Sequence, residues 1–230
     1  MNILLLVIVG ILGLTAFVGY KKGLIKIAVS LLATVLLTAA VGMVSPYISQ
    51  WIMKASSLEQ KTQKKMVEML LPDEKAEKDE LSREQQISVI EESKLPKTFR
   101  QLLLENNNKE VYDALGVTSF IEYIGSYIAK VVSDILAFLI TLVLGVVILQ
   151  IIVGMSGVLD KMPVVGGMNR VVGCIVGMGI GLVLVWILFI AVTLLYDTSF
   201  GMACFAQIEG NPILNYLYEN NFLMKYIIKF

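Results

Sequence analysis

The chain has 230 residues, of which 57% are hydrophobic and 17% charged, and its 19 basic and 19 acidic side chains give zero net charge. A mean hydropathy of +0.76 lies outside the range of ordinary soluble domains, so a lipid bilayer is the expected solvent. Balanced charge provides no global field for nucleic acid, which we exclude as an expected partner. The sequence contains no histidine, which removes the usual base of a nucleophilic site and the commonest zinc ligand. We therefore expect no enzyme, no cofactor and no metal site.

Four stretches contain no charged residue, and each is long enough to cross a bilayer core of about 30 Å as a helix. They are Met1 to Tyr20, Ile27 to Met53, Ile135 to Leu159 and Val171 to Tyr196. The sequence predicts an all-α membrane protein with four transmembrane helices arranged as two hairpins. Residues 1–53 form the first hairpin, with spans at about 2–20 and 27–48. Residues 131–196 form the second, with spans at about 132–156 and 171–196.

A short basic turn joins the first two spans and contains Gly19, Lys21, Lys22 and Gly23. A cleaved signal peptide carries its positive charge before the apolar run, whereas these lysines follow it, so we expect a retained helix. Short loops rich in lysine remain on the cytoplasmic side of a membrane. With four spans, this rule predicts that both termini are extracytoplasmic.

Residues 54–130 form a long polar connection, which span counting places outside the cytoplasm. Three capping-box patterns predict short helices within it: Ser57-x-x-Gln60, Ser82-x-x-Gln85 and Ser119-x-x-Glu122. An apolar face at three- and four-residue steps follows, from Phe120 to Val131. We expect this last segment to lie along the membrane surface before the chain turns into the third span.

Small residues recur at four-residue steps in three of the spans, a spacing that lets helix backbones approach closely in lipid. They are Ser30, Thr34, Thr38 and Gly42; Ser133, Ala137, Thr141 and Gly145; and Gly173, Gly177 and Gly181. We favour helix packing over a polar pore lining, because conducting pathways usually add ionisable groups. We expect Gln150 to bond a neighbouring helix rather than a solute, because one amide alone makes a poor binding site. Lys130 and Asp134, one turn apart, are expected to form an interfacial ion pair.

The connection between the last two spans has the densest pattern of special residues. It contains Asp160, Lys161, Pro163, Gly166, Gly167, Asn169, Arg170 and Gly173. The proline ends the preceding helix, the glycine pair permits unusual backbone angles, and the asparagine can cap the next span. We interpret this as an ordered cytoplasmic turn that binds a partner; anchoring of its basic residues to anionic headgroups is an equal alternative. Residues 197–230 are predicted to be an interfacial carboxy-terminal tail.

This turn, followed by Gly177 and Gly181, resembles the signature turn of the colicin V production protein family of bacterial membrane proteins. The first hairpin is similar too, through Gly19-Tyr20-Lys21-Lys22-Gly23-Leu24-Ile25. The loop of residues 54–118 is longer than in compact members of that family. The resemblance implies a plasma-membrane protein associated with toxin production or export and with envelope maintenance, and it implies no established reaction.

The function that we expect is that of a multi-pass accessory or scaffold protein. The alternative is a small oligomeric channel or transporter, since four spans with few polar groups leave little room for a solute path in one copy. The expected partners are the lipid bilayer and other membrane or envelope proteins, and a homo-oligomer stays open.

Overall fold

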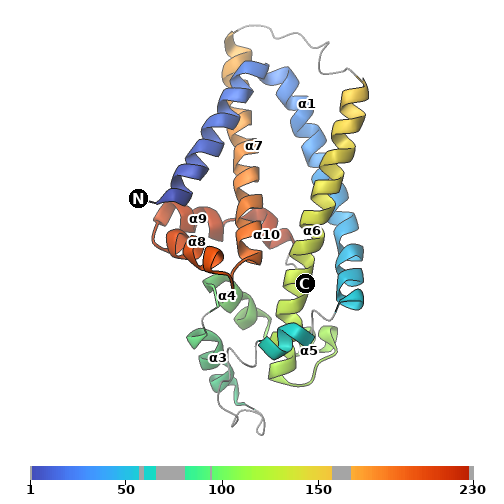
Figure 1. The fold of residues 1–230 in the computed structure, drawn as a ribbon, viewed down its shortest axis with the longest axis vertical. Helices are drawn as coiled ribbons and strands as arrows, with labels where there is room; N and C mark the ends of the chain where they lie inside the picture. The colour runs from blue at the N-terminus through green and yellow to red at the C-terminus, as the bar shows by residue number, and fades with distance from the viewer. Residues whose placement is uncertain (1, 57–59, 66–80, 94, 157–166, 228–230) are drawn as a thin grey trace. The chain divides into compact units, whose positions relative to one another are not determined.

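The computed structural model describes residues 2–56, 60–65, 81–93, 95–156 and 167–227, and every regular element within them is an α-helix. Figure 1 shows their arrangement. The elements are α1 (Ile3–Ala55), α3 (Arg83–Glu92), α4 (Lys97–Asn106), α5 (Lys109–Leu115), α6 (Phe120–Ser156), α7 (Gly167–Leu194), α8 (Ser199–Glu209), α9 (Pro212–Glu219) and α10 (Phe222–Ile227).

Four stretches of these helices are long and apolar enough to span a membrane: Ile3–Lys22, Leu32–Ala55, Phe120–Ile151 and Asn169–Leu194. The prediction of an all-helical chain with four such helices is confirmed. The first two belong to one 53-residue helix, α1, so the predicted tight turn at Lys21, Lys22 and Gly23 is helical instead. Lysine and the aliphatic residues around this glycine are good helix formers, which explains the continuity. The pairing of the spans into two hairpins stays a prediction.

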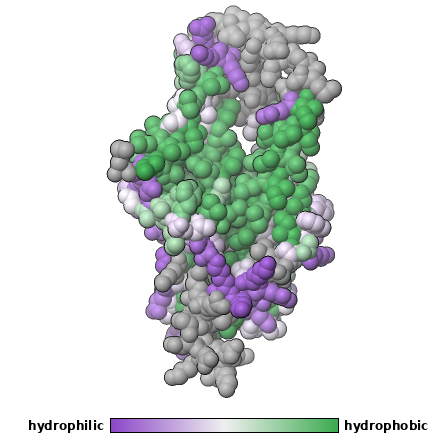
Figure 2. All heavy atoms as spheres, in the orientation of Figure 1, coloured by the Kyte–Doolittle hydropathy of each residue, from purple (hydrophilic) through white to green (hydrophobic). Residues whose placement is uncertain are grey.

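The span helices expose large apolar side chains, as lipid-facing helices do. Leu14, Leu32, Val143 and Ile175, one from each candidate span, are between 58% and 68% exposed. Figure 2 shows the resulting apolar surface over the long helices, with hydrophilic residues gathered beyond it. Water would make so large an apolar surface costly, so a bilayer is the appropriate solvent.

The helices form two compact units, one of Met1–Ser45 and Phe138–Ile227 (unit 1) and the other of Pro46–Ala137 (unit 2). In unit 1, α8, α9 and α10 pack against the C-terminal part of α7 (Figure 1). Phe189 of α7 and Phe205 of α8 each meet the ring of Tyr218 edge-on, at centroid distances of 5.5 and 5.6 Å. Val185 of α7 is fully buried as well.

The start of α1 is capped by α8 within unit 1. The Asn2 amide donates to the backbone oxygen of Gln207 at 2.8 Å, and the Gln207 side-chain oxygen accepts from the Leu4 amide at 3.0 Å. Asn2 also accepts from the Leu5 amide at 2.9 Å. Helix N-termini leave amides without partners, and here residues far apart in the chain supply them.

Unit 2 has its own core, formed by α3, α4, α5 and the first part of α6. Ile90, Phe99, Leu103, Tyr123 and Tyr127 are at most 1% exposed. The Tyr123 hydroxyl donates to the backbone oxygen of Leu103 at 2.7 Å, which ties α6 to α4. The described residues of the predicted 54–130 segment are mostly helical, as expected, and its extracytoplasmic placement stays a prediction.

Two of the three predicted capping boxes are present in unit 2. Ser82 and Gln85 cap α3 reciprocally, and Ser119 and Glu122 do the same at the start of α6. The third pattern, Ser57-x-x-Gln60, lies partly outside the described residues.

The prediction that Phe120 to Val131 lies on the membrane surface is wrong. Helix α6 runs without a break for 37 residues, from Phe120 to Ser156. The apolar face at its start is covered by protein, since Tyr123, Ile124, Tyr127, Ile128 and Val131 are at most 2% exposed. The sequence pattern does indicate an apolar face, but the core of unit 2 covers this face, where lipid headgroups were expected to do so.

Candidate functional site

Glycines bring α1 and α7 into backbone contact within unit 1. A methyl group built on Gly177 would lie 3.1 Å from the Cα of Gly19 and closer still to the backbone oxygen of Thr15. One built on Gly19 would meet the backbone oxygen of Gly173 and would lie 3.0 Å from the Cα of Gly177. Real Cβ atoms do not approach this closely. These positions therefore accept only glycine unless the helices move apart.

The same contact continues along α7 at Gly181. A Cβ there would lie 3.3 Å from the Cα of Leu12 and nearer to the hydroxyl of Thr15. All three glycines predicted to pack, Gly173, Gly177 and Gly181, are buried, whereas Gly179 is exposed with nothing within 4 Å of a built Cβ. The four-residue spacing thus falls on the side of α7 that faces α1.

Basic residues lie beside this glycine contact. The guanidinium of Arg170, at the start of α7, lies 6.0 Å from the ring centroid of Tyr20, and the ammonium of Lys21 lies 4.7 Å from the ring of Phe17. Both distances allow cation–π attraction. We define the two-turn surface as Gly19, Tyr20, Lys21 and Lys22 of α1 together with Asn169, Arg170 and Gly173 of α7.

The two-turn surface joins the two motifs that the sequence singled out, although they lie about 150 residues apart in the chain. Arg170, Lys21 and Lys22 are exposed, so their charges are available to a partner. The side-chain nitrogen of Asn169 is buried and has no hydrogen-bond partner among the described residues. Gly167 begins α7. Asp160, Lys161, Pro163 and Gly166, the other half of the predicted turn, lie outside the described residues.

A second polar contact joins α1 to α6 within unit 2. The Ser49 hydroxyl donates to the Asp134 carboxylate at 2.5 Å, and the Ser133 hydroxyl donates to the Ser49 backbone oxygen at 3.0 Å. Asp134 also forms the predicted ion pair with Lys130, at 2.7 Å. Ser49 is 4% exposed and Ser133 is fully buried, so these bonds work in a low dielectric, where they are strong.

Gln150 is the polar residue expected to bond a neighbouring helix. The structure places it on α6 with its side chain exposed, among exposed apolar residues such as Val147 and Ile151. An amide facing hydrocarbon without a partner is costly. A second protein that bonded the Gln150 amide would therefore stabilise this side of α6.

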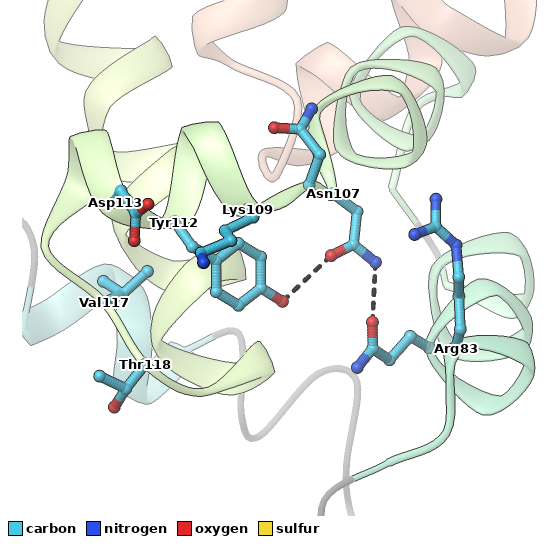
Figure 3. A pocket seen from close by; sticks show the side chains of 9 residues that line it. Arg83, Asn107, Lys109, Tyr112, Asp113, Val117 and Thr118 are labelled. Carbon is cyan, nitrogen blue, oxygen red and sulfur yellow. Dashed lines mark hydrogen bonds between the residues drawn. The ribbon is translucent and has the colours of Figure 1, made fainter.

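Unit 2 contains an open pocket of about 510 Å³, shown in Figure 3. A chain of hydrogen bonds crosses it: the Tyr112 hydroxyl donates to Asn107 at 3.0 Å, and the Asn107 amide donates to Gln86 at 2.8 Å. Arg83 and Asp113 stand on opposite sides of the pocket (Figure 3), and Lys109 lies between them.

The pocket offers hydrogen-bond donors and acceptors to a polar group. Burial raises the pKa of Tyr112, so its hydroxyl stays protonated and keeps donating to Asn107 at neutral pH. The Thr118 hydroxyl, which also lines the pocket, donates to the Glu122 carboxylate at 3.3 Å. The described residues also contain no group of three or more acidic or cysteine side chains placed to hold a metal ion.

Several of these residues could not be found from the sequence. Ser49, Asn107 and Tyr112 sit in ordinary local patterns, and their roles depend on partners distant in the chain. Ser49 also lies outside the four-residue series of Ser30, Thr34, Thr38 and Gly42, whose next position is Pro46, so that spacing does not indicate it.

Four long apolar helices define the class of the chain as a multi-pass α-helical membrane protein. Comparison of the chain with models of known protein families, with curated proteins and with solved structures gave no match. Its family and its activity are therefore matters for proposal.

Proposed function

We propose that this chain is an accessory or scaffold protein of the bacterial plasma membrane, of the kind that the resemblance to the colicin V production family implies. It holds partner proteins of the envelope rather than transforming a substrate, and toxin production or export is the process in which we place it. The observation that carries this proposal is the two-turn surface, where both family-like motifs meet through backbone contact between Gly19, Gly173 and Gly177.

The chemistry of this surface favours recognition. Arg170 is exposed over the ring of Tyr20, and Lys21 and Lys22 extend the positive charge on α1. An arginine held on an aromatic ring presents a planar fork of donors, which suits a carboxylate on a partner. The glycine contact fixes the two helices beneath it, so the charges keep their positions.

The proposed orientation follows the positive-inside rule. It places the two-turn surface in the cytoplasm and both termini, with residues 54–130, outside it. Polar binding groups in unit 2, such as Arg83 and Lys109, are then available to an extracytoplasmic partner.

Charge-preserving substitutions in the native host test this proposal. Arg170→Lys replaces a planar guanidinium by an ammonium, and the Lys21→Arg/Lys22→Arg pair does the reverse, while both keep the positive charge. If a partner docks here, Arg170→Lys at normal membrane level fails to complement a deletion strain, whereas Lys225→Arg, a control far from the surface in the chain, complements fully. Full complementation by Arg170→Lys and by Arg170→Gln would overturn the docking role, and loss only in the uncharged variant would indicate headgroup anchoring.

A small oligomeric channel or transporter is the second candidate function, and exposed Gln150 is the observation that favours it. Several copies could turn this amide toward a shared path. Ion flux through liposomes containing the purified protein, compared with a Gln150→Leu variant, tests the alternative: a flux that the variant abolishes supports a pathway.

A further inference from the structure

The carboxy-terminal helices bind α7 well inside its apolar stretch. Asn221, between α9 and α10, is 1% exposed, and its amide donates to the backbone oxygen of Trp186 at 2.9 Å. Its side-chain oxygen accepts from the Met224 amide at 3.0 Å, so the start of α10 is fastened to α7.

The depth of this bond follows from helix geometry. The candidate span Asn169–Leu194 has 26 residues, and its midpoint falls between Gly181 and Leu182. Trp186 is four to five residues beyond that midpoint, about 7 Å along the axis at 1.5 Å per residue. Half of a bilayer core is about 15 Å thick. The bond therefore lies within the hydrocarbon region when the span is centred.

A second contact indicates the same depth on a different helix of unit 1. A Cβ built on Gly42 of α1 would lie 2.8 Å from the Cε1 atom of Tyr226 in α10. The charge-free stretch Ile27 to Met53 has its midpoint at Ala40, so Gly42 is two residues, about 3 Å, from that midpoint along the axis. Two independent contacts thus place α10 beside the middle of spans rather than at their ends.

The outer surface of these helices is also suited to lipid. Ile213, Tyr216 and Phe222 are between 61% and 67% exposed, while Leu214, Tyr218 and Leu223 are buried beneath them. The outer side also carries polar residues, half-buried Asn215 and Glu219 and exposed Asn220 and Lys225, so the two contacts above, rather than the apolar side chains alone, indicate the depth.

The breaks between these helices satisfy their own backbone groups, as hydrocarbon requires. The Asn211 side chain accepts from the amides of Ile213 and Leu214, and the Asn220 side chain donates to the backbone oxygen of Tyr216. Asn221 supplies the cap of α10. Side chains therefore replace the water that a surface loop would use.

We propose that α9 and α10 form a re-entrant membrane element, which enters the bilayer beside α7 and does not cross it. Lipid covers the outer surface of this element: Ile213, Tyr216 and Phe222 contact the acyl chains of the bilayer that the four spans cross. This placement is deeper than the interfacial tail expected from the sequence. Lys225 is accommodated because its long apolar stem lets the ammonium reach toward the headgroups.

Spin-label accessibility in vesicles tests the proposal with the full chain. Tyr216 or Phe222 is replaced by a single cysteine in a background carrying Cys174→Ala and Cys204→Ala. Each variant is labelled with a nitroxide and reconstituted into vesicles of phosphatidylcholine and phosphatidylglycerol. Collision with oxygen, which enters hydrocarbon, is compared with collision with a water-soluble nickel chelate. Val143, exposed on α6, is the lipid control, and Lys109 of unit 2 is the water control.

We expect labels at both test positions to show the oxygen-dominated accessibility of the Val143 label. A label at Phe200, in the first turn of α8, should give a shallower depth in the bilayer. Nickel-dominated values like those at Lys109, or a depth at the headgroups, would overturn the re-entrant element. Protection from both reagents at both positions would also overturn it, because a second protein surface would then cover this face. Ile213→Cys supplies a third position if either variant is poorly folded.

Discussion

Gly177 and Gly179 lie two residues apart in α7 but have opposite surroundings. A Cβ on Gly177 meets the backbone of α1, whereas one on Gly179 meets nothing within 4 Å. We expect Gly177→Ala to lose about 1–3 kcal/mol of stability in detergent through overpacking. Gly179→Ala should be neutral or slightly stabilising, because alanine favours a helix. Thermal unfolding followed by circular dichroism measures both, and equal behaviour of the pair would contradict the close contact.

Ser49 is buried and donates to a carboxylate, whereas Ser56, just beyond the end of the same helix, is exposed, which makes them a matched pair. The hydroxyl of Ser49 donates to half-buried Asp134, while that of exposed Ser56 donates to the backbone oxygen of Ile52. Bonds to charged groups contribute about 1.5–3 kcal/mol. Ser49→Ala should lower the free energy of unfolding by an amount in that range, and Ser56→Ala by close to nothing. A small effect at Ser49 would mean that Lys130 alone satisfies the carboxylate.

Cys204 provides a test of the packing between α8 and α7. Its side chain is 6% exposed, and burial raises the pKa of its thiol, so little reactive thiolate forms at neutral pH. A membrane-impermeant maleimide should therefore label it slowly in the folded protein and quickly after unfolding in SDS. Rapid labelling of the folded protein would show that α8 is detached. Because the thiol is buried, maleimide labelling of Cys204 is not a suitable reporter of membrane topology.

At the scale of elements, two adjacent asparagines allow the attachment of α10 to α7 to be tested separately from local capping. Asn221 bonds the backbone of α7, whereas Asn220 bonds Tyr216 within its own turn. Asn221→Ala loses both a buried bond and a helix cap, so we expect a loss of about 1–3 kcal/mol. Asn220→Ala, at an exposed site, should cost less than half as much. Proteolysis of the carboxy-terminal segment in detergent measures the release of α10, and similar cleavage of both variants would contradict its attachment.

The elements also show where a pattern in the sequence decides structure by itself. The capping boxes at Ser82 and Ser119 involve neighbours three residues away, so the sequence sufficed to predict them. The apolar face after Phe120 was equally visible, but what covers it was not, because a headgroup layer and a protein core accept the same periodicity. The α3–α5 core that buries it is assembled from residues distant in the chain.

At the scale of the whole molecule, the orientation in the membrane is a prediction from charge. Reporter fusions after Lys22 and after Arg170 should read as cytoplasmic, and fusions after Glu92 and after Glu209, the end of α8, as extracytoplasmic. The re-entrant element does not change this pattern, because it does not cross the bilayer. A fusion after Lys22 that reads as external would invert the proposed topology.

Hydropathy predicted the four span helices because backbone amides in hydrocarbon must bond within a helix. The glycine spacing of α7 indicated which side faces another helix, and Gly177 does contact α1. The sequence could not indicate that the other helix contributes Thr15 and Gly19. Pairwise contacts of this kind, like the pocket of Arg83 and Asn107, depend on tertiary arrangement rather than on periodicity.

The bonds between Asn2 and Gln207 have a consequence for the order in which the protein can mature. Their sequence separation is 205 residues, and chains are synthesised at about 5–20 residues per second. The first helix therefore waits roughly 10 to 40 s before the residue that completes its capping has been made. During that interval its leading amides depend on water, lipid headgroups or the insertion machinery. Final seating of the first helix is thus a late event, set by the ribosome's arrival at α8 rather than by membrane insertion.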